Sequence, residues 1–192
     1  MCGILKTPNN ARGGALFDKK LIAYFSRADE NYFGGAIRYI EVGNTEIVVN
    51  KIAEMMEADI FKIEMKTPYS KEYKACIEEA KIHKFEDKRP ELVSIPDSVD
   101  EYDTLILAYP NYWGTMPMAV FTFLDAFDFS GKTILPICTN EGSGMGISEN
   151  DIRKLCPNSK VKKGLSLIGS EVENSDKEIE NWLKVNENKK TR

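Results

Sequence analysis

The sequence predicts an α/β fold in which a parallel sheet carries helices on both faces. Short apolar runs, of the kind that form strands buried on both faces, recur along the chain. Segments with apolar residues at three- and four-residue spacing lie between these runs and indicate helices. Because strand and helix alternate, we expect right-handed βαβ crossovers and a ligand site at the carboxyl ends of the strands.

The expected strands are four strongly apolar runs at residues 20–26, 59–64, 104–109 and 133–138, and a weaker fifth at 161–168. Helical patterns cover residues 45–57, 71–84, 118–127, 148–155 and 175–185. All but the second of these open with a plausible cap residue or a proline. Two connections are long, at residues 27–42 and at about 67–100. The second holds the helix at 71–84 and then a stretch punctuated by Pro90 and Pro96, which is expected to be irregular.

A single domain is expected over residues 19–185. Residues 1–18 lack periodicity and are interpreted as a flexible leader, and residues 186–192 as a charged tail. A chain of 192 residues buries roughly 70% of the surface that its unfolded form exposes, so its core needs no disulfide or metal. Its size is therefore no obstacle to an enzyme.

Composition excludes several classes of protein. The net charge of −4 argues against a nucleic-acid partner, which normally calls for a basic patch. The four cysteines form no Cys-x-x-Cys pair and accompany one histidine, so neither a zinc site nor a disulfide framework is indicated. Reduced thiols and the lack of a run of about 20 apolar residues predict a cytoplasmic protein without a membrane span.

The first candidate site joins Ser26, at the end of the first strand, to Gly43, Asn44 and Thr45 at the start of a helix. A helix N-terminus offers unpaired N–H groups and about half a positive charge, and hydroxyl and amide side chains add donors for an oxyanion. No Gly-Lys-Thr follows, so a single terminal phosphate fits better than a nucleoside triphosphate. The alternative is that Asn44 or Thr45 is only a helix cap.

The second candidate is the loop at residues 109–117, which holds the adjacent aromatics Tyr112 and Trp113 between prolines, with Gly114 after them. Large flat rings beside polar backbone suit a planar heteroaromatic ligand, because stacking adds about 0.5 to 1.5 kcal/mol to the free energy gained by burying the ring surfaces. The alternative is that Tyr112 and Trp113 fold back onto the core.

The third candidate is the loop at residues 139–147, where Gly142, Gly144 and Gly146 alternate. Alternate glycines let backbone groups approach the edge of a flat ligand. Their spacing is not Gly-x-Gly-x-x-Gly, so a dinucleotide-binding motif is not supported, and a flexible surface turn is the alternative. His83, in a Lys- and Glu-rich segment, is expected to be exposed.

Taken together, these segments resemble the flavodoxin family. The likeness runs from about Lys19 to Trp182, and its most specific stretch is Tyr-Pro-Asn-Tyr-Trp-Gly-Thr-Met-Pro at residues 109–117. It also includes Ala-Tyr-Phe-Ser at 23–26 with Gly-Asn-Thr at 43–45, Asp-Phe-Ser-Gly-Lys-Thr at 128–133, and residues 140–146. The resemblance implies a flavodoxin-like three-layer sandwich with a five-stranded parallel sheet in the order 2-1-3-4-5 that binds FMN noncovalently.

The resemblance also implies a set of cofactor-binding residues in three groups. These are Ser26, Arg27, Gly43, Asn44 and Thr45 around the phosphate; Pro110, Asn111, Tyr112, Trp113, Gly114 and Thr115 around the isoalloxazine; and Glu141, Gly142, Ser143 and Gly144 along its other edge. In short flavodoxins the phosphate loop is compact, whereas here residues 27–42 intervene. That insertion, with Tyr32, Phe33, Gly34 and Gly35, could instead form a lid or a partner surface.

Three functions remain open at this point. A flavodoxin proper would carry electrons between redox partner proteins, and this is the reading that we favour slightly. A flavodoxin-like reductase would take hydride from NAD(P)H and reduce a quinone or another small acceptor. A non-catalytic FMN- or phosphate-binding regulatory module is the hypothesis from another class.

Overall fold

The computed structural model describes residues 3–6 and 18–187. Its strands are β1 (Lys20–Tyr24), β2 (Asp29–Phe33), β3 (Ala36–Ile40), β4 (Asp59–Lys62), β5 (Thr104–Pro110), β6 (Thr133–Asn140), β7 (Lys160–Val161) and β8 (Leu165–Ile168). Its helices are α1 (Asn44–Met55), α2 (Tyr73–Phe85), α3 (Met118–Asp125), α4 (Ser148–Leu155), α5 (Asp176–Glu187) and the 3₁₀ helix η1 (Gly169–Asn174). Strand and helix therefore alternate as predicted.

The main sheet is parallel and has the order β4-β1-β5-β6-β7, with β8 also paired to β6. This confirms the predicted order 2-1-3-4-5, but the sheet has six strands because the fifth predicted strand is interrupted. β7 pairs with the start of β6 and β8 with its end. Between them the N–H of Gly164 donates to a carboxylate oxygen of Glu149, at 2.6 Å, and so leaves the ladder.

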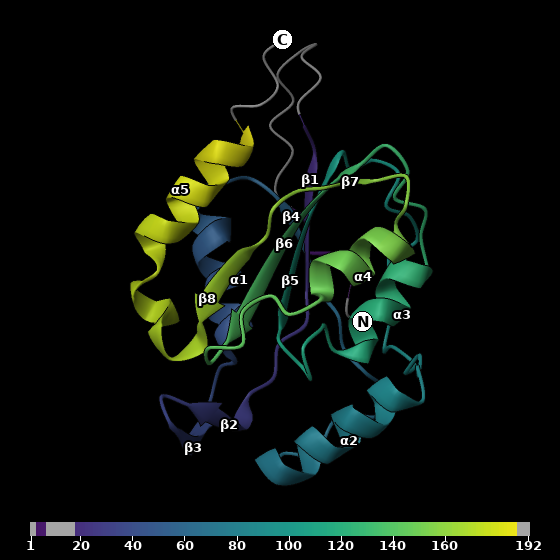
Figure 1. Cartoon of the computed structure of the whole chain (residues 1–192). Helices are drawn as coiled ribbons and strands as arrows, with labels where there is room; N and C mark the ends of the chain where they lie inside the picture. Colours follow the sequence, from purple (N-terminus) through teal and green to yellow (C-terminus); the bar gives the residue numbers. More distant parts are fainter. Residues whose placement is uncertain (1–2, 7–17, 188–192) are drawn as a thin grey trace.

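Helices α1 and α5 cover one face of this sheet, and α3 and α4 cover the other (Figure 1). The strand side chains alternate between the two faces, as the pleat requires. Leu21 and Ala23 belong to the apolar cluster with Phe123 of α3, whereas Ile22 belongs to the cluster with Val48 of α1. Each central strand is therefore buried on both sides, which explains its continuous apolar run.

Two further elements lie at the end of the sheet where β1 terminates, seen at the bottom of Figure 1: α2 and the β2–β3 hairpin. The hairpin occupies most of the predicted insertion and pairs antiparallel from Asp29↔Ile40 to Phe33↔Ala36. Its turn consists of Gly34 and Gly35, both with positive φ (58° and 90°). Glycine accepts this conformation without steric cost, so the two residues allow a tight hairpin.

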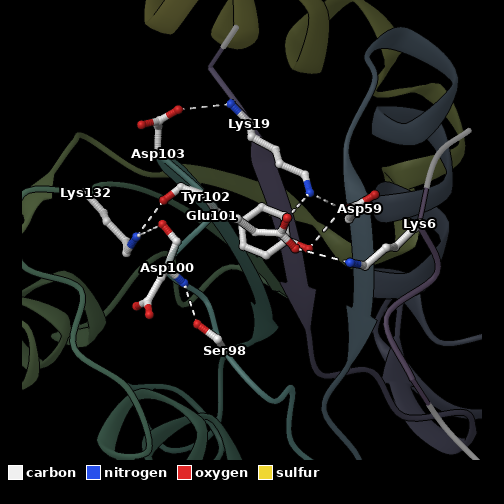
Figure 2. Close-up of polar contacts among 9 residues, drawn as sticks. All are labelled: Lys6, Lys19, Asp59, Ser98, Asp100, Glu101, Tyr102, Asp103 and Lys132. Carbon is white, nitrogen blue, oxygen red and sulfur yellow. Dashed lines mark hydrogen bonds and ion pairs between the residues drawn. The ribbon is translucent and has the colours of Figure 1, made fainter. Parts of the chain in front are cut away.

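A polar network lies at the opposite end, around the first residues of β1, β4 and β5 (Figure 2). The carboxylate of Asp59, 3% exposed, accepts the hydroxyl of Tyr102 at 2.9 Å and lies 3.4 Å from the ammonium of Lys19. Lys132 donates to the backbone carbonyls of Asp100 and Tyr102. This network joins the segment before β5 to the starts of three strands.

Part of the predicted leader has a place in the fold, because Leu5 exchanges backbone hydrogen bonds with Ile60 at the edge of β4. Residues 7–17 of the leader and 188–192 of the predicted tail lie outside the described residues. Within the part that the structure covers, no helix is long and apolar enough to cross a membrane.

Candidate functional site

The three predicted loops converge on one cavity of about 280 Å³ at the carboxyl ends of β1, β5 and β6. Nine predicted residues line it: Ser26, Arg27, Asn44, Thr45, Pro110, Asn111, Tyr112, Glu141 and Ser143. Six further residues also line it: Thr139 and Asn140 of the third candidate loop, Asn31 and Tyr32 of the predicted insertion, and Tyr73 and Gly169, to which the sequence did not point. Trp113 and Gly114 lie in a neighbouring cavity, and Gly43, Thr115, Gly142 and Gly144 line neither.

The floor of the cavity is the N-terminus of α1. The hydroxyl of Ser26 accepts the N–H of Glu46, at 3.1 Å, and so caps the helix from the neighbouring strand loop. The N-cap residue itself is Gly43, without a side-chain cap, so neither Asn44 nor Thr45 has the role proposed in the alternative. Among the residues described, no acceptor is found for the backbone N–H groups of Asn44 and Thr45. Two donors at a helix N-terminus are thus available for an anion.

Close packing around this floor explains why glycine is needed there. A Cβ atom on Gly43 would come within 2.2 Å of the Ser26 hydroxyl and 2.6 Å of the Arg27 carbonyl. A Cβ atom on Gly169 would come within 2.4 Å of the Asn44 amide nitrogen and 2.8 Å of a Glu141 carboxylate oxygen. Gly169 was not predicted, because nothing local in its sequence shows that β8 delivers it to this point.

Thr45 contributes a buried hydroxyl that shares a hydrogen bond, 2.8 Å long, with the hydroxyl of Thr139 at the end of β6. The bond joins the first and third candidate segments across the intervening strand. A threonine hydroxyl has one proton and two lone pairs, so this single contact leaves the Thr45 hydroxyl with capacity for two more partners.

Arg27 lines the cavity, but its guanidinium is already committed. It donates to the carbonyls of Ser70, Lys71 and Glu30. These bonds hold the start of the hairpin against the segment that leads into α2. Its positive charge therefore lies beside the anion site, while its N–H groups are used in fixing the chain.

The aromatic loop is a tight two-residue turn. The N–H of Tyr112 donates to the carbonyl of Thr115 at 2.8 Å, the reverse bond is 3.2 Å, and both central residues have positive φ (Trp113 54°, Gly114 82°). Positive φ is strained for a bulky residue such as tryptophan, and it persists only where the surroundings hold it. The indole N–H of Trp113 donates to the carbonyl of Ile77, at 2.7 Å, which places the ring against α2.

The side chain of Tyr112 points toward the core, as the alternative interpretation of the aromatic loop proposed for both Tyr112 and Trp113. Its ring contacts Phe25 and Tyr69 in the core, its hydroxyl lies 3.7 Å from the Cys76 thiol, and burial holds its pKa well above the ordinary value. The same side chain forms the wall between the first cavity and the second, of about 340 Å³. The second cavity is closed by Trp113 and by the side of α2 that carries Cys76, Ile77 and Ala80.

The glycine loop is held by an asparagine that was not among the predicted site residues. The side-chain oxygen of Asn140 accepts the N–H groups of Gly142 and Gly144, each at 2.9 Å. The loop is also pressed onto the aromatic loop, since a Cβ on Gly146 would lie 2.1 Å from the carbonyl oxygen of Gly114. The third candidate is therefore a fixed wall and not a flexible turn.

The remaining candidates for chemistry are inert or remote. Cys76, Cys138 and Cys156 are buried free thiols, and burial raises the pKa of Cys138 and of Cys156 to about 12. His83 is partly buried against Tyr69, contrary to expectation, and burial lowers its pKa. Across residues 3–6 and 18–187, no group of three potential metal-binding side chains is found.

A helix N-terminus with two free N–H groups, faced by an aromatic loop and a glycine loop at the carboxyl edge of a doubly wound parallel sheet, is the arrangement of the flavodoxin-like class. The chain belongs to the flavodoxin family: a family model described as Flavodoxin matches residues 19–186. No curated protein matches the sequence.

Solved structures with the same fold include two from Bacteroides. A protein of Bacteroides eggerthii DSM 20697 that is assigned as a flavoprotein is 25% identical, with a TM-score of 0.70 over 87% of this chain and 96% of that one. Another assigned as a flavoprotein, from Bacteroides uniformis ATCC 8492, is 26% identical, with a TM-score of 0.67 over 86% and 97%. A flavoprotein of Lactobacillus acidophilus NCFM in complex with FMN is 16% identical, with a TM-score of 0.57 over 82% and 97%, and shares the fold.

Proposed function

We propose that this chain binds FMN without a covalent bond and transfers electrons through it. The observation that carries the proposal is the pair of free N–H groups of Asn44 and Thr45 at the floor of the cavity. They suit the terminal phosphate of a mononucleotide, and the Arg27 charge beside them adds to the attraction. The solved flavoprotein of Lactobacillus acidophilus with FMN supports the choice of mononucleotide.

The rest of the cavity fits the flavin part of this cofactor. Pro110, Asn111 and Tyr112 form one wall, Glu141 and Ser143 the other, and the second cavity continues the space toward Trp113. Together the two cavities have the size and the aromatic lining of a site for a ligand as large as FMN. The bound flavin would supply the one- or two-electron chemistry, while the chain fixes its position and excludes water.

The mouth of the second cavity favours electron transfer with a protein partner. Trp113, which lines this cavity, is 44% exposed, and Ile147, 51% exposed, is joined by its N–H to the carbonyl of Gly114, the residue that follows Trp113. Lys81 lies over the Trp113 ring, and Lys84 donates to the Trp113 carbonyl. An apolar rim flanked by ammonium groups suits a redox protein with an acidic docking surface.

A reductase of small acceptors is the second candidate, and the second cavity favours it. Cys76, Ile77 and Ala80 form an uncharged wall suited to a flat neutral molecule such as a quinone. Steady oxidation of NADH or NADPH by the purified holoprotein, with a quinone as acceptor, would support the reductase. FMN binding without such turnover, but with reduction by a reduced ferredoxin, would support the carrier.

The test of FMN binding is a titration of the apoprotein with FMN and with riboflavin, for the parent and for Thr45→Ala. Losing one hydrogen bond to a charged group costs about 1.5 to 3 kcal/mol, so the variant should bind FMN ten- to a hundredfold more weakly. Riboflavin should bind the parent weakly and the variant no worse. Thr122→Ala is the matched control, because that hydroxyl binds the carbonyls of Pro90 and Met118, away from both cavities.

Two results would contradict the proposal. Equal affinity of the parent for FMN and riboflavin would show that the protein does not bind the phosphate. Absence of flavin binding of either kind would leave the regulatory module, with a ligand other than flavin, as the remaining hypothesis.

A further inference from the structure

The β2–β3 hairpin reaches across the cavity from one wall to the other. Asn31 and Tyr32 of β2 line the cavity, and Tyr32 lies beside Tyr73 of α2, with ring centroids 6.4 Å apart. β3 is almost wholly exposed and pairs with β2 alone. An isolated two-stranded hairpin is marginal in water, so this one depends on the contacts at its ends to keep its position.

The base of the hairpin is held by several bonds. Arg27 joins the carbonyl of Glu30 to the carbonyls of Ser70 and Lys71. The carboxylate of Glu30 accepts the N–H of Tyr73, at 3.0 Å, where α2 begins, and its own N–H donates to Lys71. A carboxylate at a helix N-terminus is also favoured by the helix dipole. This end is therefore a fixed point.

Among the described residues, Glu141 is the side chain that hydrogen-bonds the tip of the hairpin to the body of the protein. Glu141 accepts the N–H of Gly34 through one carboxylate oxygen, at 3.1 Å. Its other partners fix it to the body of the protein: the N–H of Ser170 at 2.7 Å and the Ser170 hydroxyl at 2.9 Å. Glu141 itself lines the cavity. The tip contact is thus a charge-assisted bond that can break without disturbing the base.

We infer that the β2–β3 hairpin is a cover for the phosphate end of the cofactor cavity, latched at its tip by Glu141. Tyr32 is then a further cofactor-binding residue, brought onto the ligand when the latch closes. Asn31, whose amide donates to the carbonyls of Arg27, Ala28 and Asp29, lines the cavity from the fixed base. The hairpin opens by rotating about its fixed base, and the rate of opening limits how fast the cofactor enters and leaves. This inference rests on the proposed binding of FMN.

The cover can be locked by a disulfide. A Cβ atom at position 34 would lie 3.6 Å from the Cβ of Ser170, inside the range that disulfides require. The test uses the double variant Gly34→Cys/Ser170→Cys of the full chain, loaded with FMN while reduced. Release of FMN is followed by its fluorescence after a chase with excess riboflavin. Oxidation should slow release by at least tenfold, and subsequent reduction should restore it.

The controls separate the lock from incidental effects. The single variant Gly34→Cys carries the same strained residue at φ 58° and the same buried cysteines, and its release rate should not change on oxidation. Glu141→Gln weakens the latch without a crosslink. It should speed both FMN release and FMN entry, entry by about tenfold, whereas the loss of a contact between Glu141 and the cofactor would speed release alone.

The outcomes are distinguishable. Equal release rates in the oxidised and reduced double variant, with the disulfide shown by mass spectrometry, overturn the cover. A dissociation constant of Glu141→Gln that rises by the same factor as the release rate, with entry unchanged, makes Glu141 a simple contact and also overturns it. If the parent does not bind FMN, both the proposed function and the inference that the hairpin is a cover are overturned. If the disulfide does not form, the Glu141→Gln rates decide.

Discussion

The two ends of the main sheet use polar residues in opposite ways. At the carboxyl end, the N–H groups of Asn44 and Thr45 have no acceptor among the described residues, and Trp113 is held in a strained conformation. At the amino end, the buried carboxylate of Asp59 is matched by the Tyr102 hydroxyl and the Lys19 ammonium (Figure 2). One end keeps donors available and the other pairs them within the chain.

The charges at the amino end reinforce each other. Burial alone would lower the pKa of Lys19, but its hydrogen bond to Glu101 and the charges of Asp59 and Glu101 outweigh burial and raise that pKa. The bond from Lys19 also lowers the pKa of Glu101. Because Lys19 and Glu101 each favour the charged form of the other, and Asp59 is paired with both Lys19 and Tyr102, the network stabilises the fold and its polar groups are used within the chain. Available donors thus indicate the functional end of the sheet.

The substitution with the largest expected effect is Gly43→Ala, at the carboxyl end. Its Cβ would meet the Ser26 hydroxyl and the Arg27 carbonyl, so α1 must move away from the end of β1. Overpacking of this kind costs about 1 to 3 kcal/mol, and it displaces both free N–H groups at once. We expect FMN affinity to fall by about a hundredfold in a fluorescence titration. An affinity within threefold of the parent would mean that the floor of the cavity does not bind the phosphate.

The second prediction concerns Asp59→Ala, at the amino end, and it should give the opposite pattern. Without the carboxylate, the hydroxyl of Tyr102 loses its acceptor and Lys19 loses an ion-pair partner. Tyr102 is only 2% exposed, so water does not readily replace that acceptor. A lost partner of a buried polar group costs about 1 to 3 kcal/mol, so the free energy of unfolding in urea should fall by about 2 kcal/mol. FMN affinity should stay within twofold, and a larger change would show that the two ends are coupled.

Most of the sheet could be predicted from local pattern, because strands buried on both faces are apolar throughout. The interruption between β7 and β8 could not be predicted from local pattern, because it depends on the hydrogen bond from Gly164 to Glu149, fifteen residues away in sequence. The hairpin was missed although it had a signal. Gly34 and Gly35 separate two runs rich in aromatic and β-branched residues, which is the pattern of a tight hairpin.

The site divides in the same way. Tyr112 and Ser143, in the loops that follow β5 and β6, line the cavity because the carboxyl ends of parallel strands meet at one edge of the sheet, and the sequence pattern could indicate this. Thr45 lines it from the start of α1. Gly169 and Tyr73 come to it through tertiary packing and carry no local signal. Whether these residues bind FMN stays a prediction.

The third prediction compares two glycines of the loop after β6. Gly144 and Gly146 both have positive φ (64° and 55°), so alanine at either costs about 1 to 2 kcal/mol of backbone strain. Only at position 146 would the Cβ also strike the Gly114 carbonyl. Gly146→Ala should therefore weaken FMN binding about tenfold more than Gly144→Ala. Equal losses would show that the contact between the two loops does not position the flavin site.

The smallest expected effect is on the alkaline stability of Tyr102→Phe. Burial and the hydrogen bond to Asp59 raise the pKa of Tyr102 well above 10 in the folded chain. The unfolded chain releases this proton near pH 10 and the folded chain retains it, so folding is stabilised fully below pH 10 and progressively less as pH rises above it. The loss amounts to at most about 1.4 kcal/mol per pH unit from this residue.

Tyr102→Phe should consequently be about 1 kcal/mol less stable than the parent at pH 8, because one hydrogen bond is gone. It should lose less stability between pH 10 and pH 11, so that the two curves converge. Urea unfolding at pH 8, 10 and 11 measures this, with Tyr39→Phe, exposed at 67%, as the control. Parallel curves would mean that Tyr102 has the same pKa in the folded and the unfolded chain. The amino end of the sheet would then be more accessible to solvent than its hydrogen bonds indicate. FMN affinity at pH 8 should be the same in both proteins, since no residue of this network lines either cavity.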